Sequence, residues 1–279
     1  MNDTFERSCE HWSEEAREEM EDFYALATVD YQHLAESRDW VSWFTAQKTA
    51  AGSRPLRLLD VACGSGKFPR ALVKHAGLGA DSIDPVDYAL LDPSPFSIAE
   101  TKRVLPAPFV AGAEYEETLQ GLSAEPNSFD VVWATHALYA LPADELDEAM
   151  KKFVRALRPG GAGFIAHSAS DGHYVAFYRD FLEDFRGGSG TPYTSAEQII
   201  EALGRCGASF SVEAIEYANG ATDEHRDQVE GYLQRCAFDD SVSLDAMLGA
   251  PTVGKRLSAA RSAGAWAFRQ RVMLISISG

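Results

Sequence analysis

The stretch of sequence that decides the fold of this protein is Leu58-Leu59-Asp60-Val61-Ala62-Cys63-Gly64-Ser65-Gly66-Lys67. Its apolar first half is typical of a buried strand, and the glycines that follow predict a tight turn before a helix. Glycine lets the backbone turn sharply and approach a ligand closely, and the first turn of a helix has N–H groups without backbone partners. In open α/β sheets, ligands bind beyond the carboxyl ends of the strands. The stretch therefore predicts a ligand site at the turn between Gly64 and Gly66.

The segments on both sides of this turn alternate between expected strands and expected helices. This alternation is typical of a parallel sheet with helices on both faces, so we expect a doubly wound α/β fold. The expected strands cover residues 56–61, 88–91, 109–111, 131–134 and 162–167, and the expected helices cover residues 67–76, 95–104 and 143–157.

The two ends of the chain depart from this alternation. Residues 11–50 carry apolar side chains at helical spacing, and the sheet begins only at Leu56, so we expect residues 1–54 to form a helical lid over the ligand site. Within the main domain, residues 55–279, we expect helical insertions for substrate at about 170–205 and 223–265. The last strand, 271–278, alternates apolar and polar residues. We expect it to pair antiparallel with a strand at 209–217, at the end of the sheet.

Composition disfavours several classes of partner. The sequence has 42 acidic and 25 basic residues, a formal net charge of −17. Nucleic acids and anionic membranes repel such a surface, because binding to them relies on Lys and Arg. No apolar run approaches the roughly 20 residues that span a bilayer, and the first residues show no signal peptide. We therefore expect a cytoplasmic protein that binds neither nucleic acid nor membrane.

A metal site is not expected either. The seven histidines show no ligand spacing, and no Cys-x-x-Cys pair is present. The sequence thus predicts neither a zinc site nor a disulfide framework. The four cysteines are scattered: Cys9, Cys63, Cys206 and Cys236.

Three interpretations of the glycine turn compete. A phosphate-binding P-loop needs glycine at position 61 and Ser or Thr at 68, where this chain has Val61 and Phe68. A dinucleotide fingerprint needs a third glycine at position 69, where this chain has Pro69. The remaining interpretation is a loop that binds S-adenosylmethionine.

Together with the turn, three later segments resemble motifs of the class I S-adenosylmethionine-dependent methyltransferases in order and spacing. The resemblance covers residues 56–167. It implies a Rossmann-like sheet that is mostly parallel with an antiparallel last strand, and S-adenosylmethionine as cofactor. The segments are Leu90-Leu91-Asp92-Pro93-Ser94, Phe129-Asp130-Val131-Val132-Trp133-Ala134 and Leu157-Arg158-Pro159-Gly160-Gly161.

This resemblance also implies a cofactor role for particular residues. Asp60 would anchor the loop or hold the cofactor's ammonium group, and Asp92, at the end of the second strand, would bind the ribose hydroxyls. The other implied positions are Gly64 and Gly66 beside the methionine part, Glu114 toward the adenine, and Thr135 at the border of the cofactor.

The chain after residue 56 also resembles, more diffusely, the histamine N-methyltransferase group. This resemblance implies a substrate pocket in which His136 stands where that group has glutamine, and Gln270 where it has asparagine. The group's acidic substrate ligand has no clear match, and Asp30 is the nearest acid. The segments that carry the resemblance are 91–94, 138–142, 168–172 and 193–195, and the other implied pocket residues are Tyr139, His173, Phe177 and Phe238.

These observations predict a methyltransferase that acts on a small molecule with a nitrogen or sulfur acceptor. His136 and Tyr139 are the candidate catalytic residues; His136 could act as a general base, but we expect it to orient the acceptor. Asp30 could hold a substrate ammonium group. A methionine-type thioether is the alternative acceptor, and a non-catalytic, cofactor-binding regulator is a further alternative. The oligomeric state stays open.

Overall fold

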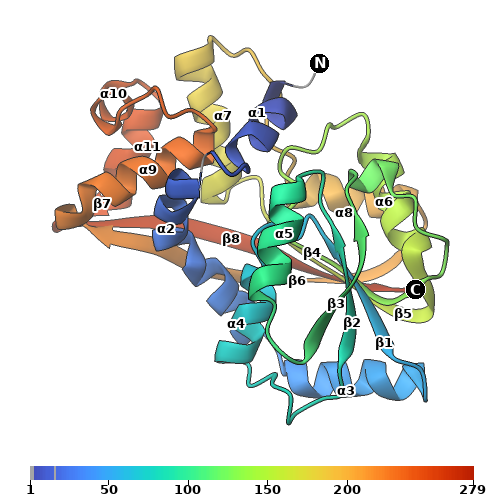
Figure 1. Cartoon of the computed structure of the whole chain (residues 1–279). Helices are drawn as coiled ribbons and strands as arrows, with labels where there is room; N and C mark the ends of the chain where they lie inside the picture. The colour runs from blue at the N-terminus through green and yellow to red at the C-terminus, as the bar shows by residue number, and fades with distance from the viewer. Residues whose placement is uncertain (1–2, 16) are drawn as a thin grey trace.

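One mixed sheet forms the centre of the protein, whose computed structural model describes residues 3–15 and 17–279 (Figure 1). The strand order is β3-β2-β1-β4-β5-β8-β6, and the first five of these strands run parallel. β8 pairs antiparallel with both β5 and β6, as predicted for the last strand. The strands are β1 (Leu56–Val61), β2 (Val86–Leu91), β3 (Phe109–Tyr115), β4 (Phe129–Thr135), β5 (Leu157–Ser168), β6 (Ser209–Thr222), β7 (Arg261–Ser262) and β8 (Ala265–Ser278).

Helices cover both faces of this sheet, which confirms the predicted doubly wound α/β fold. Successive strand residues point to opposite faces, so Leu58 joins one core cluster and Leu59 the other. The two faces therefore bury separate apolar layers. The helices packed on the sheet are α3 (Trp40–Ala51), α4 (Lys67–His75) and α5 (Pro95–Val104) on the Leu58 face, and α6 (Leu146–Ala156) and α8 (Ala196–Arg205) on the Leu59 face.

The predicted N-terminal lid divides into parts with different packing. α3 belongs to the sheet core, since the Trp40 ring packs on Phe68 at 5.4 Å and the Phe44 ring on Trp133 at 6.0 Å. A lid could therefore consist only of α1 (Asp3–His11) and the start of α2 (Arg17–Glu36). Residues 1, 2 and 16 of the predicted lid lie outside the described residues.

The last third of the chain adds a helical layer beside the far ends of β6 and β8 (Figure 1). These two strands are longer than predicted, because their pairing continues from Ser209 opposite Ser278 to Thr222 opposite Ala265. No helix among the described residues is long and apolar enough to cross a membrane. The helices here are α7 (His173–Arg186), α9 (Arg226–Ala237), α10 (Leu244–Gly249) and α11 (Val253–Ala260), with a short 3-10 turn at Asp223–His225; a second such turn, Leu119–Gly121, lies between β3 and β4.

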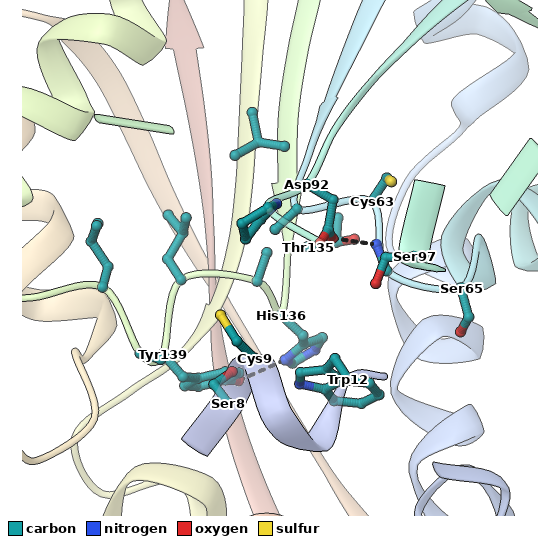
Figure 2. A pocket seen from close by; sticks show the side chains of 18 of the residues that line it. Ser8, Cys9, Trp12, Cys63, Ser65, Asp92, Ser97, Thr135, His136 and Tyr139 are labelled. Carbon is teal, nitrogen blue, oxygen red and sulfur yellow. Dashed lines mark hydrogen bonds between the residues drawn. The ribbon is translucent and has the colours of Figure 1, made fainter. Parts of the chain in front are cut away.

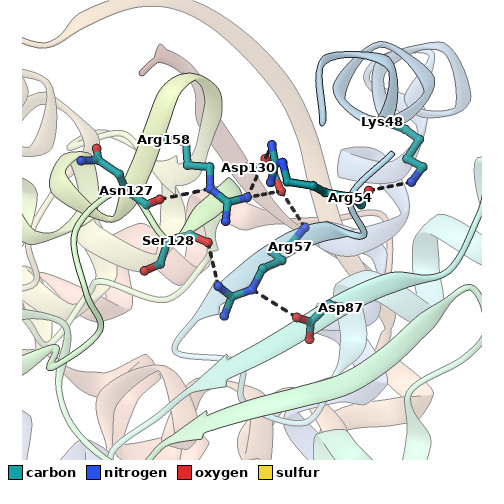
Figure 3. A network of polar contacts seen from close by, with 8 residues as sticks. All are labelled: Lys48, Arg54, Arg57, Asp87, Asn127, Ser128, Asp130 and Arg158. Carbon is teal, nitrogen blue, oxygen red and sulfur yellow. Dashed lines mark hydrogen bonds and ion pairs between the residues drawn. The ribbon is translucent and has the colours of Figure 1, made fainter. Parts of the chain in front are cut away.

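A charged network ties together the ends where β1 and β4 begin (Figure 3). The buried carboxylate of Asp130 accepts hydrogen bonds from Arg158 at 2.9 and 3.0 Å, from Arg54 at 3.1 Å and from the backbone of Arg57 at 2.9 Å. Burial alone would raise the pKa of Asp130, but these donors hold it below its usual value. The network lies at the end of the sheet opposite the carboxyl ends of the strands.

Candidate active site

A cavity opens at the carboxyl ends of β1, β2 and β4, where the glycine turn predicted a ligand site (Figure 2). Its walls come from strand ends, from the loops that follow them, and from helices of both ends of the chain. The strand ends and loops supply residues 60–65, 91–93, 117–120 and 135–141, and the two ends of the chain supply, among others, Phe5, Trp12, Tyr24, Asp30, Tyr31, Tyr174, Tyr193, Arg235 and Phe238.

The two glycines of the turn have different roles. Both adopt left-handed backbone conformations, with φ of +53° at Gly64 and +65° at Gly66, which favour glycine. Gly64 lines the cavity, and a Cβ there would meet no atom within 4 Å. Gly66 is not a lining residue: a Cβ there would lie 3.1 Å from Val104 and 3.3 Å from Thr101. The prediction that Gly66 borders the cofactor is therefore corrected, because this glycine allows α5 to approach the turn.

Asp60 lines the cavity at the end of β1, but both of its oxygens already have partners. Tyr88 donates its hydroxyl proton to Oδ2 at 2.6 Å, and the Trp133 indole donates to Oδ1 at 2.7 Å. Burial raises the pKa of Asp60 to about 7. Two roles were open for Asp60: anchoring the loop or holding the cofactor's ammonium group. These contacts fit the first role, because both carboxylate oxygens are already bonded within the protein.

Asp92 lies where β2 ends, on the wall of the same cavity. Its Oδ2 accepts a hydrogen bond from the backbone N–H of Gly64 at 3.1 Å, and its Oδ1 accepts one from the N–H of Ser94 at 2.9 Å. Burial raises its pKa to about 6. A carboxylate has about four lone-pair sites, so Asp92 keeps capacity for further donors such as ribose hydroxyls.

Thr135 lines the cavity, whereas Glu114 does not. Glu114 lies within β3 rather than after it, and its carboxylate pairs with Lys102 of α5 at 2.6 Å. The prediction that Glu114 faces the adenine is therefore corrected. Residues 117–120, which follow β3, line the cavity instead.

His136 and Tyr139 lie together on the loop after β4. The Tyr139 hydroxyl is 2.8 Å from Nδ1 of His136, and the Tyr217 hydroxyl of β6 is 3.5 Å from its Nε2. His136 adopts a left-handed backbone conformation, with φ of +53°, which is uncommon for a residue with a side chain. Burial lowers the pKa of His136 to about 3, so the ring is neutral near pH 7.

Asp30 of α2 lies in the interior and not on a solvated helix face: it is only 2% exposed. Tyr174 donates to its Oδ2 at 2.5 Å and Asn219 donates to its Oδ1 at 2.7 Å. The Tyr217 hydroxyl also faces this carboxylate and acts to lower its pKa. Burial raises the pKa of Asp30 to about 7, against the effect of these donors.

Three predicted pocket residues do not line the cavity. The His173 ring packs 5.3 Å from that of Phe177 and 4.7 Å from that of Phe268, in the core between α7 and β8. Gln270 points into the same region and donates to Asn219 at 2.8 Å. The predicted substrate contacts of His173, Phe177 and Gln270 are therefore corrected, because these side chains are buried behind the wall. Phe238, by contrast, lines the cavity.

Sequence reasoning missed the residues that the N-terminal helices contribute. Ser8, Cys9 and Trp12 surround the cavity together with Asp92, Thr135 and His136 (Figure 2). No local pattern could place them there. Tyr24 and Tyr31 did have a signal, because residues seven apart share one helix face. Tyr174, next to His173, was also missed.

Contacts at both of its ends hold α1 over this cavity. Thr4 donates to the carbonyl of Thr191 at 2.7 Å, and Arg235 donates to the carbonyl of His11. Ser94, which caps α5, donates to the carbonyl of Trp12 at 3.0 Å. No group of side chains with metal-ligand geometry occurs among the described residues.

Comparisons with known proteins relate part of the sequence to methyltransferases. The profile of a family described as "Methyltransferase domain" matches residues 59–162. A probable methyltransferase of Aspergillus luteorubrus is 30% identical over 105 residues, which are 37% of this chain and 37% of that protein. The match thus spans little more than a third of that relative's length.

Solved structures share the fold at low sequence identity. Magnesium protoporphyrin IX methyltransferase from Synechocystis, solved with bound SAH, gives a TM-score of 0.56 at 13% identity and covers 99% of this chain and 100% of its own. A methyltransferase of Thermotoga maritima, described as a possible histamine N-methyltransferase, gives 0.52 at 12% identity and covers 96% and 98%. These structures therefore share the fold of this chain, and within that fold residues 59–162 match a methyltransferase domain.

Proposed function

We propose that this protein transfers the methyl group of S-adenosylmethionine to a small molecule through a nitrogen or sulfur acceptor, such as an amine, an imidazole or an amino acid. One observation carries the proposal. A single cavity is lined at one side by Gly64 and Asp92 and at another by His136 and Tyr139. A cofactor and an acceptor bound in it would lie next to each other.

The residues at the Gly64 side fit the cofactor. The backbone of Gly64 faces open space, so a ligand can approach it closely. Asp92 is buried beside it and would accept hydrogen bonds from the ribose hydroxyls. The bound cofactor supplies a methyl group on a positively charged sulfur, which is already a good electrophile. The protein then has to align the acceptor and exclude water.

The acceptor side is rich in aromatic rings. The His136 ring lies 6.0 Å from Tyr31, 6.2 Å from Tyr139 and 6.1 Å from Tyr174. Aromatic faces attract cations, which suits an ammonium or sulfonium group. Neutral His136 would orient the acceptor through the Tyr139 hydroxyl, which lies 2.8 Å from its Nδ1. An amine, an imidazole and a thioether all fit this environment.

α1 would act as the lid of the site. It lines the cavity with Ser8 and Cys9, and its contacts reach α7, α9 and the start of α5. Exclusion of water strengthens the electrostatic interactions inside such a site. Exchange of ligands would then require α1 to move.

A ligand-binding series followed by turnover tests this function. Thermal shift and calorimetry with S-adenosylhomocysteine, NAD and ATP come first; a ligand at about 100 times its Kd should stabilise the fold by about 2.7 kcal/mol. We expect stabilisation by S-adenosylhomocysteine. Histamine and methionine, each incubated with S-adenosylmethionine, are then analysed for methylated product by mass spectrometry.

The outcomes separate the alternatives. Stabilisation by NAD instead of S-adenosylhomocysteine would refute the proposal and favour a dinucleotide enzyme. Cofactor binding without methylation of any compound in a wider panel of amines, imidazoles and amino acids would favour the regulatory alternative.

A further inference from the structure

A line of hydrogen-bonding groups leads away from the acceptor side of the cavity. It begins at Tyr139, continues through both ring nitrogens of His136 to Tyr217, and ends at the carboxylate of Asp30. The first step measures 2.8 Å and the second 3.5 Å. Catalytic hydrogen bonds are often long without substrate and tighten in the complex. The line joins elements that are far apart in sequence.

The donors and acceptors along this line can all point in one direction. With the proton of His136 on Nε2, Tyr139 donates to Nδ1, Nε2–H donates to the Tyr217 oxygen, and Tyr217 donates to Asp30. The Tyr139 oxygen lies on the cavity wall, where Ser168 also faces it, and its remaining lone pair can accept a hydrogen bond from a bound molecule. When the proton of each hydrogen bond moves in turn from its donor to its acceptor, one proton is in effect transferred from the cavity to Asp30.

Asp30 is suited to receive this proton rather than to hold a cation. Its carboxylate already accepts hydrogen bonds from Tyr174 and Asn219, and the Tyr217 hydroxyl also faces it. The described groups that face Asp30 are neutral near pH 7. If Asp30 took up a proton, no positive charge among these groups would therefore lose its partner. These groups come from α2, the loop after β4, α7, β6 and α9: Tyr31, Tyr139, Tyr174, Tyr217, Asn219, Tyr232 and Cys236.

We propose that Tyr139, His136, Tyr217 and Asp30 form a proton relay that removes a proton from the methyl acceptor, so that the acceptor is an N–H or O–H compound and not a thioether. The inference rests on the proposed methyl transfer. It assigns Asp30 the end of the relay in place of the predicted ammonium site.

The step balances in charge and atoms. The acceptor's lone pair forms the new bond to the methyl carbon, and the carbon–sulfur bond breaks with its electron pair on sulfur. The acceptor's proton passes to Tyr139, and one proton moves along each hydrogen bond until Asp30 is protonated. The positive charge of the sulfonium and the negative charge of Asp30 disappear together. A thioether would give a sulfonium product with no proton to remove, and the relay would be idle.

Two tyrosine variants give a matched test. Tyr217→Phe and Tyr174→Phe each remove one hydroxyl that faces Asp30, but only the Tyr217 hydroxyl also lies within hydrogen-bond reach of a His136 ring nitrogen. With histamine as acceptor, we expect Tyr217→Phe to lower kcat on the order of 100-fold with little change in KM. Tyr174→Phe should cost much less in kcat. In the wild type, kcat should fall as the pH drops below about 7, where Asp30 takes up a proton, and Tyr217→Phe should lose this dependence.

Several results would overturn the relay. Equal kcat for Tyr217→Phe and the wild type would do so, as would methionine as the methylated compound. If Asp30→Asn raised only KM for a cationic acceptor and left kcat unchanged, Asp30 would be an ammonium ligand instead.

A second measurement does not depend on turnover. Nitrogen-15 NMR of labelled histidines, with His136→Asn to assign the signal, should show the Nε2–H tautomer of His136. A proton on Nδ1 would overturn the relay even if methyl transfer were established. Absence of methyl transfer together with the Nε2–H tautomer would count against the proposed function and not against the relay.

Discussion

The backbone N–H of Gly64 donates a 3.1 Å hydrogen bond to the carboxylate of Asp92. This bond joins the glycine turn after β1 to the acidic residue at the end of β2, the two features that the sequence assigned to the cofactor. It holds the turn and the carboxylate at one wall of the cavity. Asp92 therefore has a structural partner as well as a proposed ligand.

Replacement of Asp92 by Ala should weaken binding of S-adenosylhomocysteine by about 1–3 kcal/mol, because ribose hydroxyls would lose their acceptor. Glu114→Ala is the matched control: this carboxylate pairs with Lys102 and does not line the cavity, so affinity should stay the same. Isothermal titration calorimetry measures both. Equal affinity for Asp92→Ala and the wild type would contradict the ribose assignment.

Asp130→Asn should destabilise the fold by about 1–3 kcal/mol, since a buried carboxylate would lose charged bonds to Arg158 and Arg54 (Figure 3). Asp147→Asn removes a pair with Arg205 in which both side chains are exposed to water, and it should destabilise the fold much less, because water screens an exposed pair. Urea unfolding near pH 7 gives both values. If both variants lowered the free energy of unfolding by a similar amount, burial of the Asp130 network would add nothing to the stability of the fold.

Local patterns predicted the parts of the site that lie next to the strands. Asp60, Gly64 and Asp92 follow expected strands, and parallel strands bring their carboxyl ends to one edge of the sheet. The alternation predicted the parallel sheet, but it did not give the order of the strands in that sheet. Thr135 and His136 follow an expected strand in the same way, and both line the cavity.

The helical walls could not be predicted in this way. Neighbouring helix residues point about 100° apart, and the sequence alone does not say which face meets the cavity. His173 was expected there, but Tyr174 lines it. The position of α1 over the site depends on contacts such as that of Thr4 with Thr191, which are 187 residues apart and which no local pattern records.

His173→Phe should make the protein less sensitive to acid. Burial, with Arg256 nearby, lowers the pKa of His173 to about 3, so the folded state keeps the ring neutral while the unfolded state takes up a proton below about pH 6.5. The unfolded state therefore binds more protons, and stability is lost as the pH falls from 6.5 toward 3. At about pH 5 this loss amounts to about 2 kcal/mol, and Phe would remove it.

Urea unfolding at about pH 5 and about pH 7.5 checks this prediction. The Nε2 atom of His173 has no hydrogen-bond partner among the described residues, and the ring packs against Phe177 and Phe268. Replacement of His173 by Phe therefore removes no hydrogen bond of that atom. Gln in place of the exposed His225 is the control for loss of a surface histidine. A stability gain of His173→Phe that is the same at both pH values would contradict the linkage.

Thr4→Val should loosen α1 from the rest of the protein. The fully buried Thr4 hydroxyl donates to the Thr191 carbonyl at 2.7 Å and lies 2.9 Å from the Tyr178 hydroxyl. Its loss should cost about 1–2 kcal/mol of docking energy, which raises the open population of α1 about 5- to 30-fold. Trypsin should then cut faster at Arg7, within α1.

Thr45→Val is the matched control, because the Thr45 hydroxyl bonds only within α3 to the Val41 carbonyl and is exposed; its cleavage rate at Arg7 should equal that of the wild type. S-adenosylhomocysteine should slow the cut in both the wild type and Thr4→Val, since α1 lines the cavity in which the ligand would bind. If ligand that binds by calorimetry gave no protection at Arg7, α1 would not close over the cofactor. The helix would then be a fixed part of the wall, and ligands would have to enter past another element.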